Sequence, residues 1–227
     1  SKTLYKYSRL FGFGSKSKID LYGETNGSLK DEKKWSKISL GQISMGHEIG
    51  VTALQLALAY SSIANGGYLL KPYIVDEVNS EKDESYKKTN PKVIRKIATE
   101  EIMTNMTTML RKVVTQGTGE YADVAGWEIA GKTGTAQKYI DGQYSNEKFI
   151  SNFVGFFPAS NPQILTAIIL DEPKMPMHWG GTGAAVAFKR VVKRIINMDD
   201  TIKPPIKKDK ILVSENLKSL KKNIDLK

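Results

Sequence analysis

The sequence contains no cysteine among its 227 residues. This absence excludes disulfides, thiolate nucleophiles and thiolate metal sites together. Histidine is nearly as scarce, because His47 and His178 are the only two, and neither stands at metal-binding spacing from a second ligand type. We therefore expect no metal site and no cofactor, and we interpret both histidines as structural or surface residues.

Long apolar runs are also missing. No stretch of about twenty apolar residues occurs, so we expect no membrane span within the sequence. The sequence begins with Ser1, and no signal-peptide pattern precedes the first helical pattern, so we interpret it as a piece of a longer protein. Its length and composition are those of an ordinary globular protein of one or two domains.

The charge is strongly unbalanced, at +10 at neutral pH. Such a charge is typical of nucleic-acid-binding proteins, but here the lysines are scattered and no helix-turn-helix, zinc-finger or RNA-binding motif accompanies them. We therefore expect no nucleic-acid partner. A basic surface is equally compatible with an anionic cell-wall or membrane-surface setting.

The most informative stretch runs from Ile129 to Gln137 and reads Ile-Ala-Gly-Lys-Thr-Gly-Thr-Ala-Gln. Residues 124–129 before it are largely apolar, so we predict a β-strand through both segments. Alternation along a strand places Thr133 and Thr135 on one face. A glycine inside a strand marks a place where a ligand or another backbone approaches closely. A cation, two hydroxyls and an open backbone edge suit a peptide-like ligand that carries a carboxylate.

Two helices are predicted before this strand. The first spans Thr52 to Asn65, begins with a capping box of Thr52 and Gln55, and is apolar nearly all round, so we expect it to be buried. The second follows Thr99, and three- and four-residue steps predict its apolar stripe: Ile102, Met106, Met109, Leu110 and Val113.

Residue patterns also predict the structural elements of the remaining chain. A polar connection is predicted over 139–147 and a polar hairpin tip over 79–90. Antiparallel strands are predicted over 150–157 and 164–171, and a helix with a basic outer face follows Gly180. We assign 1–198 to the folded domain and 199–227 to a lysine-rich tail, disordered or weakly helical.

The string Ala130 to Gln137 resembles the third active-site motif, Lys-Thr-Gly, of penicillin-binding proteins and serine β-lactamases. Three further strings resemble the class B penicillin-binding transpeptidases, the branch that includes the septal division enzyme, and they occur in the family's order: Leu10 to Gly14, Gly46 to Gly67, and Asn152 to Pro158. The resemblance extends from about Thr3 to Ile196. It implies an α/β (α+β) fold of the penicillin-binding protein and β-lactamase-like kind, an antiparallel sheet flanked by helices.

The resemblance also implies roles for the motif residues. Lys132 would supply positive charge to the proton-transfer network, and the backbone amide of Thr135 would form half of an oxyanion hole. Thr133 and Thr135 would bind the terminal carboxylate and the peptide of the substrate, while Gly134 would leave room for it. Lys132 and Thr135 are thus the candidate catalytic residues, and Thr133, Gly134 and Thr135 the candidate substrate-binding residues.

The family's nucleophile is the serine of a Ser-x-x-Lys motif, which we expect at the start of an apolar helix. Formal matches occur at about the frequency expected by chance and none opens such a helix: Ser15/Lys18, Ser85/Lys88, Ser145/Lys148 and Ser219/Lys222. The family's second motif is Ser-x-Asn, which precedes the third motif in its members. In this sequence the match at Ser214 follows the third motif instead. We therefore expect this chain to begin just past the first two motifs, so that the nucleophile and the N-terminal part of the fold are missing and the fragment alone is inactive.

The implied function is that of part of a peptidoglycan D,D-transpeptidase, which cross-links cell-wall stem peptides through a serine acyl-enzyme and binds penicillin. Its partners would be stem peptides ending in D-alanyl-D-alanine, β-lactams, and membrane proteins of division or elongation. Its place would be the extracytoplasmic side of the bacterial cell membrane, with the anchor outside this chain. The alternatives are a related D,D-carboxypeptidase or β-lactamase, and a non-catalytic interaction module that has lost its serine.

Overall fold

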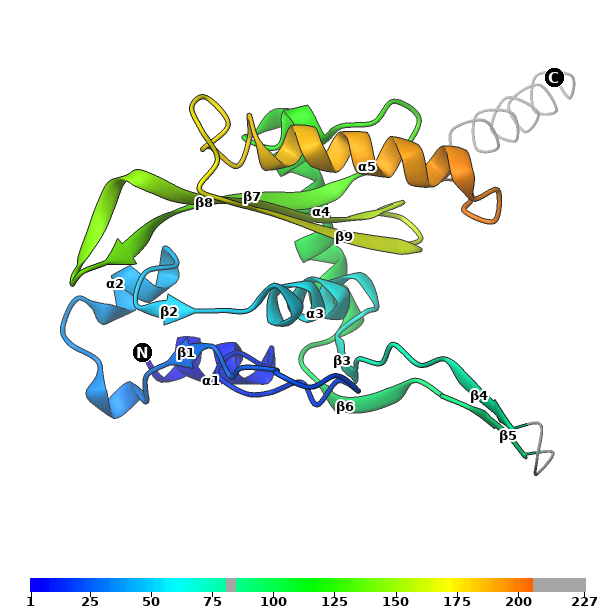
Figure 1. Cartoon of the computed structure of the whole chain (residues 1–227), viewed down its shortest axis with the longest axis horizontal. Coiled ribbons are helices and arrows are strands. Elements are labelled where there is room, and N and C mark those ends of the chain that lie inside the picture. The colour runs from blue at the N-terminus through cyan, green and yellow to red at the C-terminus, as the bar shows by residue number, and fades with distance from the viewer. Residues whose placement is uncertain (81–84, 206–227) are drawn as a thin grey trace, which may run out of the picture.

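A computed structural model of the chain describes residues 1–80 and 85–205. Its helices are α1 (Lys2–Leu10), α2 (Ser39–Ser44), α3 (Ala53–Ala64), α4 (Glu100–Gln116) and α5 (Ala184–Met198), with 3-10 turns η1 (Glu32–Lys34) and η2 (Glu120–Ala122). Its strands are β1 (Ser28–Leu29), β2 (Ile49–Gly50), β3 (Tyr68–Lys71), β4 (Glu77–Ser80), β5 (Ser85–Lys88), β6 (Lys92–Lys96), β7 (Ala130–Ile140), β8 (Gln143–Phe157) and β9 (Ile164–Asp171). Figure 1 shows their arrangement. Within these residues no helix is both long and apolar enough to cross a lipid bilayer.

The central sheet is antiparallel and has the strand order β7-β8-β9, with β7 at one edge. The strands predicted at 150–157 and 164–171 are confirmed. The polar connection predicted at 139–147 is wrong, because β7 and β8 continue through it as a hairpin that turns at Asp141 and Gly142. Both turn residues have positive φ, the conformation that two-residue hairpin turns require.

The motif strand begins at Ala130 and not at Val124. Residues 124–127 form a tight turn, in which Val124 and Trp127 make an isolated bridge and Gly126 has φ +83°. Val124 is buried and Trp127 is partly buried because the turn packs against the core, and a turn can bury apolar side chains as well as a strand can. This is why the apolar pattern alone suggested a longer strand.

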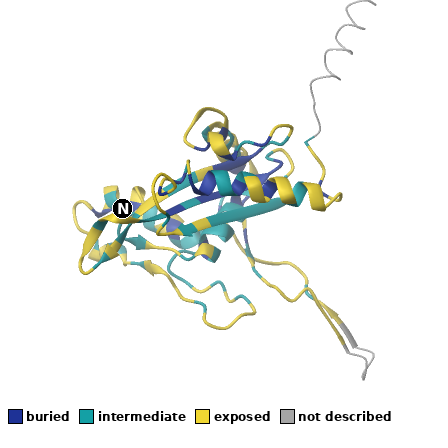
Figure 2. Ribbon diagram, turned by 45° about the horizontal axis from the view of Figure 1, so that its top comes forward, coloured by how far each residue is buried: buried dark blue, intermediate teal, exposed yellow. Residues whose placement is uncertain are grey.

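Two separate cores lie on the two faces of the sheet. On one face α5 packs through Phe188 against Phe153, with ring centroids 4.6 Å apart. On the other face Phe156 packs with residues of α3 and α4, among them Ile63 and Met103. Figure 1 shows the sheet between α5 and α3, and Figure 2 shows buried residues concentrated where α5 lies on the sheet. The predicted antiparallel sheet flanked by helices is confirmed.

Helix α3 begins as predicted. The Gln55 amide N–H donates to Thr52 Oγ1 at 3.1 Å, and the Thr52 amide donates to Gln55 Oε1 at 3.0 Å, which completes the capping box. The buried Gln55 side chain also donates through Nε2 to the carbonyl oxygens of Ser15 and Asn26, at 2.9 and 2.8 Å. The cap therefore fixes the N-terminal loop as well as the helix.

Helix α4 begins after Thr99 as predicted. The predicted apolar stripe is right for Leu110, which is buried, and for Val113, which is half-buried, but wrong for its other three members. The buried residues of α4 are Met103, Leu110 and Val114, while Ile102, Met106 and Met109 are 50%, 36% and 61% exposed. Apolar residues occupy both sets of positions at helical spacing, so periodicity could not choose between the two faces. The packing of α4 against β7 and α3 determines which of its two apolar faces is buried.

Besides the central sheet, the described residues form three two-stranded antiparallel sheets: β1–β2, β3–β6 and β4–β5. Strands β3 and β6 pair antiparallel, and β3 contacts α3. Strands β4 and β5 form an antiparallel ribbon that projects from the body in Figure 1. Six of the eight described residues of the polar tip predicted over 79–90 lie in these two strands.

The predicted tail starts with packed residues. Ile202 is 8% exposed and belongs to the core under α5. Gln163 and Lys203 exchange two hydrogen bonds, Gln163 Nε2 to Lys203 O at 2.9 Å and Lys203 N to Gln163 Oε1 at 3.0 Å. Residues 199–205 therefore belong with the folded part, and 206–227 lie outside the described residues.

Candidate functional site

The Lys-Thr-Gly motif lies in the first half of β7, at the edge of the central sheet. In the part of the chain that the structure describes, β7 pairs with β8 on one side and with no strand on the other. Backbone amides and carbonyls along an unpaired edge can bind an extended peptide as an additional strand. The motif is thus placed where a peptide-like ligand can reach it.

The register of β7 and β8 assigns each motif residue to a face. Thr133 lies opposite Phe153 and Thr135 opposite Ser151, on the face that α5 covers. Lys132 lies opposite Val154, on the other face. The prediction that Thr133 and Thr135 share a face is confirmed.

The Lys132 ammonium group contacts the next residue of its own strand, Thr133. Its Nζ donates to the Thr133 carbonyl oxygen at 3.0 Å and to Thr133 Oγ1 at 3.3 Å. Among the described residues no carboxylate forms an ion pair with Lys132, and its side chain is exposed. Its charge is therefore available to an anionic ligand at the edge of the strand.

A second hydroxyl meets Thr133 from the loop that follows α4. Thr118 Oγ1 lies 2.7 Å from Thr133 Oγ1. No spacing in the sequence of residues 116–119 indicates a contact with a residue 15 positions further along the chain. Thr118 is thus a site residue that the sequence did not predict.

The loop between β9 and α5 lies directly on the motif strand. The Gly180 amide donates to Thr135 Oγ1 at 2.9 Å. A Cβ atom at Gly180 would lie 2.5 Å from the Gly134 carbonyl oxygen, so only glycine allows this approach. A Cβ atom at Gly134 would in turn lie 2.5 Å from Asn152 Oδ1. The close neighbour on that side of Gly134 is therefore the Asn152 amide.

The same loop carries a cluster of aromatic and apolar side chains. The His178 ring is 6% exposed and lies between Phe149 and Trp179, with centroid distances of 5.1 and 4.7 Å. Trp179 and Met175 are more than half exposed. The burial of His178 among rings agrees with the structural role assigned to it from the sequence.

The base of the motif strand is held by α4. Arg111 donates from one guanidinium nitrogen to Asp123 Oδ1 at 3.1 Å and to the Ile129 carbonyl oxygen at 2.9 Å. This bond fixes the chain immediately before Ala130, and it connects α4, the 3-10 turn η2 and β7. The strand that carries the motif is thus anchored at its start.

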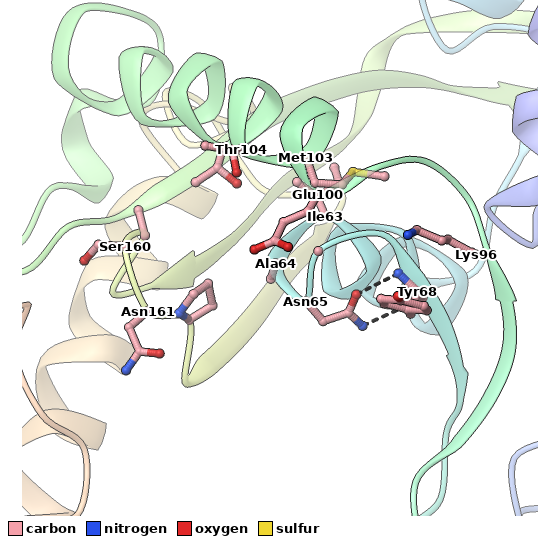
Figure 3. A pocket seen from close by; sticks show the side chains of 14 residues that line it. Ile63, Ala64, Asn65, Tyr68, Lys96, Glu100, Met103, Thr104, Ser160 and Asn161 are labelled. Carbon is pink, nitrogen blue, oxygen red and sulfur yellow. Dashed lines mark hydrogen bonds between the residues drawn. The ribbon is translucent and has the colours of Figure 1, made fainter.

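A cavity of about 490 Å³ lies elsewhere, between the end of α3, the start of α4 and the β8–β9 turn (Figure 3). Its lining residues, all within the described ranges, include none from β7. Asn65, which faces it, is engaged with the backbone of Tyr68 through bonds of 2.8 and 2.9 Å. The cavity is therefore separate from the motif.

The serines of the formal Ser-x-x-Lys matches stand in unsuitable places. Ser15 lies in the loop after α1, Ser85 in β5 and Ser145 in β8. The Ser145 hydroxyl oxygen accepts from the amides of Glu147 and Lys148, as in a local turn. The matches at Ser214 and Ser219 lie outside the described residues. Of the described pairs, none stands at the start of a helix.

Comparison with known protein families gives one match over most of the chain. Residues 1–193 match the family of the penicillin-binding protein transpeptidase domain. Stage V sporulation protein D of Bacillus subtilis is 38% identical over 191 residues, which cover 84% of this chain and 30% of the relative. The peptidoglycan D,D-transpeptidase FtsI of Buchnera aphidicola is 36% identical over 201 residues, 87% of this chain and 33% of the relative. The chain thus spans about a third of the length of these two relatives.

Solved structures agree on the fold. Penicillin-binding protein 3 of Mycobacterium tuberculosis, solved with ampicillin, superposes with a TM-score of 0.80 at 27% identity, over 92% of this chain and 48% of that one. The transpeptidase domain of Burkholderia pseudomallei penicillin-binding protein 3 gives a TM-score of 0.75 at 29% identity, over 89% and 60%. The fold expected from the resemblance is confirmed.

Proposed function

The chain belongs to the family of penicillin-binding protein transpeptidase domains, and we propose that it is part of a peptidoglycan D,D-transpeptidase that cross-links stem peptides and is acylated by β-lactams. The observation that carries the proposal is the open edge of β7, where Lys132, Thr133 and Thr135 stand together. A stem peptide ending in D-alanyl-D-alanine would lie along this edge as an added strand.

The proposed recognition of the ligand depends on the positions of the Lys132 charge and the Thr133 hydroxyl. The terminal carboxylate would lie near Lys132 Nζ and the Thr133 hydroxyl, which are already within 3.3 Å of each other. Charge-assisted hydrogen bonds to a carboxylate are roughly twice as strong as neutral ones. A β-lactam with a carboxylate beside its ring would use the same groups.

The proposed reaction would use a serine nucleophile contributed by the intact protein. Its oxygen would attack the carbonyl carbon of the penultimate D-alanine, release the terminal D-alanine and form an ester. An amine of a second stem peptide would then attack the ester and free the serine. Lys132 would stabilise the charge that develops during proton transfer, and the Thr135 amide would donate to the oxyanion.

The setting of the reaction follows from its substrate. Peptidoglycan lies outside the cytoplasm, so the domain would work on the extracytoplasmic side of the cell membrane, with an anchor elsewhere in the intact protein. Membrane proteins of division or elongation would be its partners. The ampicillin complex of the Mycobacterium tuberculosis relative supports β-lactams as ligands.

The test uses the intact protein and a fluorescent penicillin. We expect one stoichiometric adduct, on a serine outside this chain, and no adduct on any serine of residues 1–227. With a stem-peptide substrate and an amine acceptor, we expect a cross-linked product, whereas a carboxypeptidase or β-lactamase would give hydrolysis alone. A protein that forms no adduct under conditions that label a known transpeptidase would contradict the proposal.

A further inference from the structure

Two threonine hydroxyls meet at the start of the motif strand. Thr118 Oγ1 and Thr133 Oγ1 are 2.7 Å apart, the usual distance for a hydrogen bond between hydroxyls. Each hydroxyl has one proton to donate and two lone pairs to accept with. One of the two protons is used in the bond between them, and the other is left over.

The remaining proton has no acceptor in the protein. In the described part of the chain, the Thr118 hydroxyl bonds only to Thr133, and the Thr133 hydroxyl bonds only to Thr118 and Lys132. Lys132 cannot be the acceptor, because an ammonium group has donors alone. The pair of hydroxyls therefore offers one O–H donor to a third, external group.

The hydrogen bond from Lys132 determines which of the two threonine hydroxyls donates its proton to the external group. Its Nζ donates to Thr133 Oγ1 at 3.3 Å and polarises the Thr133 hydroxyl, which makes Thr133 the stronger donor of the pair. A carboxylate is a stronger acceptor than a hydroxyl, so it takes the proton of Thr133. Thr118 then donates to Thr133, and the two lone pairs of Thr133 are filled by Thr118 and Lys132.

We propose that Thr118 is a positioning residue of the carboxylate site, whose hydroxyl turns the Thr133 proton toward the terminal carboxylate of a peptide or β-lactam ligand. The inference rests on the function proposed above and adds to it a residue from outside the motif strand. Thr118 acts through Thr133 and does not itself need to touch the ligand.

The backbone around Thr118 is held in place, as a positioning role requires. The Gly119 amide donates to the Val113 carbonyl oxygen at 3.0 Å, which closes the end of α4. On the other side Gly181 approaches so closely that a Cβ atom there would lie 2.8 Å from the Thr118 carbonyl oxygen. The Thr118 side chain is exposed, so a change in it alone leaves this packing intact.

The test compares Thr118→Val, Thr118→Ser and Thr115→Val in the intact protein. Valine keeps the shape of threonine and removes the hydroxyl, whereas serine keeps the hydroxyl. Thr115 is the matched control, because its hydroxyl donates at 3.2 Å to Arg111 O within its own helix. The probes are benzylpenicillin and its methyl ester, which lacks the carboxylate, and the readout is the second-order rate constant of acylation.

We expect Thr118→Val to slow acylation by benzylpenicillin about five- to tenfold, the scale of one neutral hydrogen bond such as that between the two hydroxyls. Acylation by the ester should change less than about twofold, and Thr118→Ser and Thr115→Val should stay near the wild-type rate with both probes. Equal slowing with both probes would indicate a structural role and overturn the inference, as would no slowing with either. A wild-type protein that is not acylated at all would instead overturn the proposed function, and the inference with it.

Discussion

The amide of Gly180 donates a hydrogen bond of 2.9 Å to the hydroxyl of Thr135, and so joins the loop before α5 to the motif strand across 45 residues of sequence. The resemblance implied that the Thr135 side chain binds substrate. In the structure its oxygen holds the loop that carries Trp179, while no acceptor within residues 1–80 and 85–205 takes its proton, which a ligand could therefore use. The side chain therefore shapes the site before any ligand arrives.

The first prediction concerns this bond. Thr135→Val removes the acceptor of the Gly180 amide, so residues 172–183 should exchange amide hydrogen faster, and acylation of the intact protein should slow roughly two- to tenfold, as for one neutral hydrogen bond. Thr135→Ser keeps the oxygen and should behave as wild type. Hydrogen exchange by mass spectrometry and acylation rates measure both effects. Unchanged exchange in the valine variant would contradict the role of the bond.

The second prediction concerns Gly180 itself. In Gly180→Ala the new Cβ would lie 2.5 Å from the Gly134 carbonyl oxygen, so the loop must move off the strand. We expect slower acylation than in Thr135→Val with little loss of thermal stability. Gly41→Ala is the control, because no atom lies within 4 Å of its Cβ position and it needs no positive φ. If both alanine variants were acylated at the wild-type rate, the close contact would have no influence on the site.

The third prediction separates two lysines of β7. Lys132→Ala should slow acylation of the intact protein about a hundredfold or more, the usual scale for a group in a proton-transfer network. Lys138→Ala removes the same charge from the same strand, but Lys138 already pairs with Asp171 and Glu172 at 2.9 Å, so its loss should change the rate less than about threefold. Equal effects of the two changes would indicate that only overall charge matters.

The fourth prediction concerns pH. The hydrogen bond from Lys138 holds the pKa of Glu172 below its ordinary value of 4.5. A carboxyl group whose pKa is lower in the folded state contributes stability above its unfolded pKa and loses it as pH falls through the folded pKa. Lys138→Met should therefore lower the thermal midpoint slightly at pH 7 and leave it unchanged in acid well below pH 4.5. A difference that persisted in acid would have another cause.

The sequence was sufficient to predict features whose interacting residues lie close together along the chain. The cap of α3 was predicted to the residue because Thr52 and Gln55 lie within one turn. The far half of the β7–β8 hairpin was missed because most of its residues are polar and none is fully buried, so they show no apolar–polar alternation. The contacts of Thr118 with Thr133 and of Gly180 with Thr135 join loops to a distant strand, and no residue pattern encodes such pairs.

The open edge of β7 also has a consequence for solubility. An edge that accepts a peptide strand can accept the same edge of another molecule, which is how sheet proteins begin to aggregate. Two molecules joined in this way would bring both Lys132 ammonium groups onto one continuous sheet, where like charges repel. The charge that would attract the ligand would thus also oppose this edge-to-edge association. A variant in which Lys132 is neutral should aggregate more readily than wild type, and a bound peptide or β-lactam should protect it.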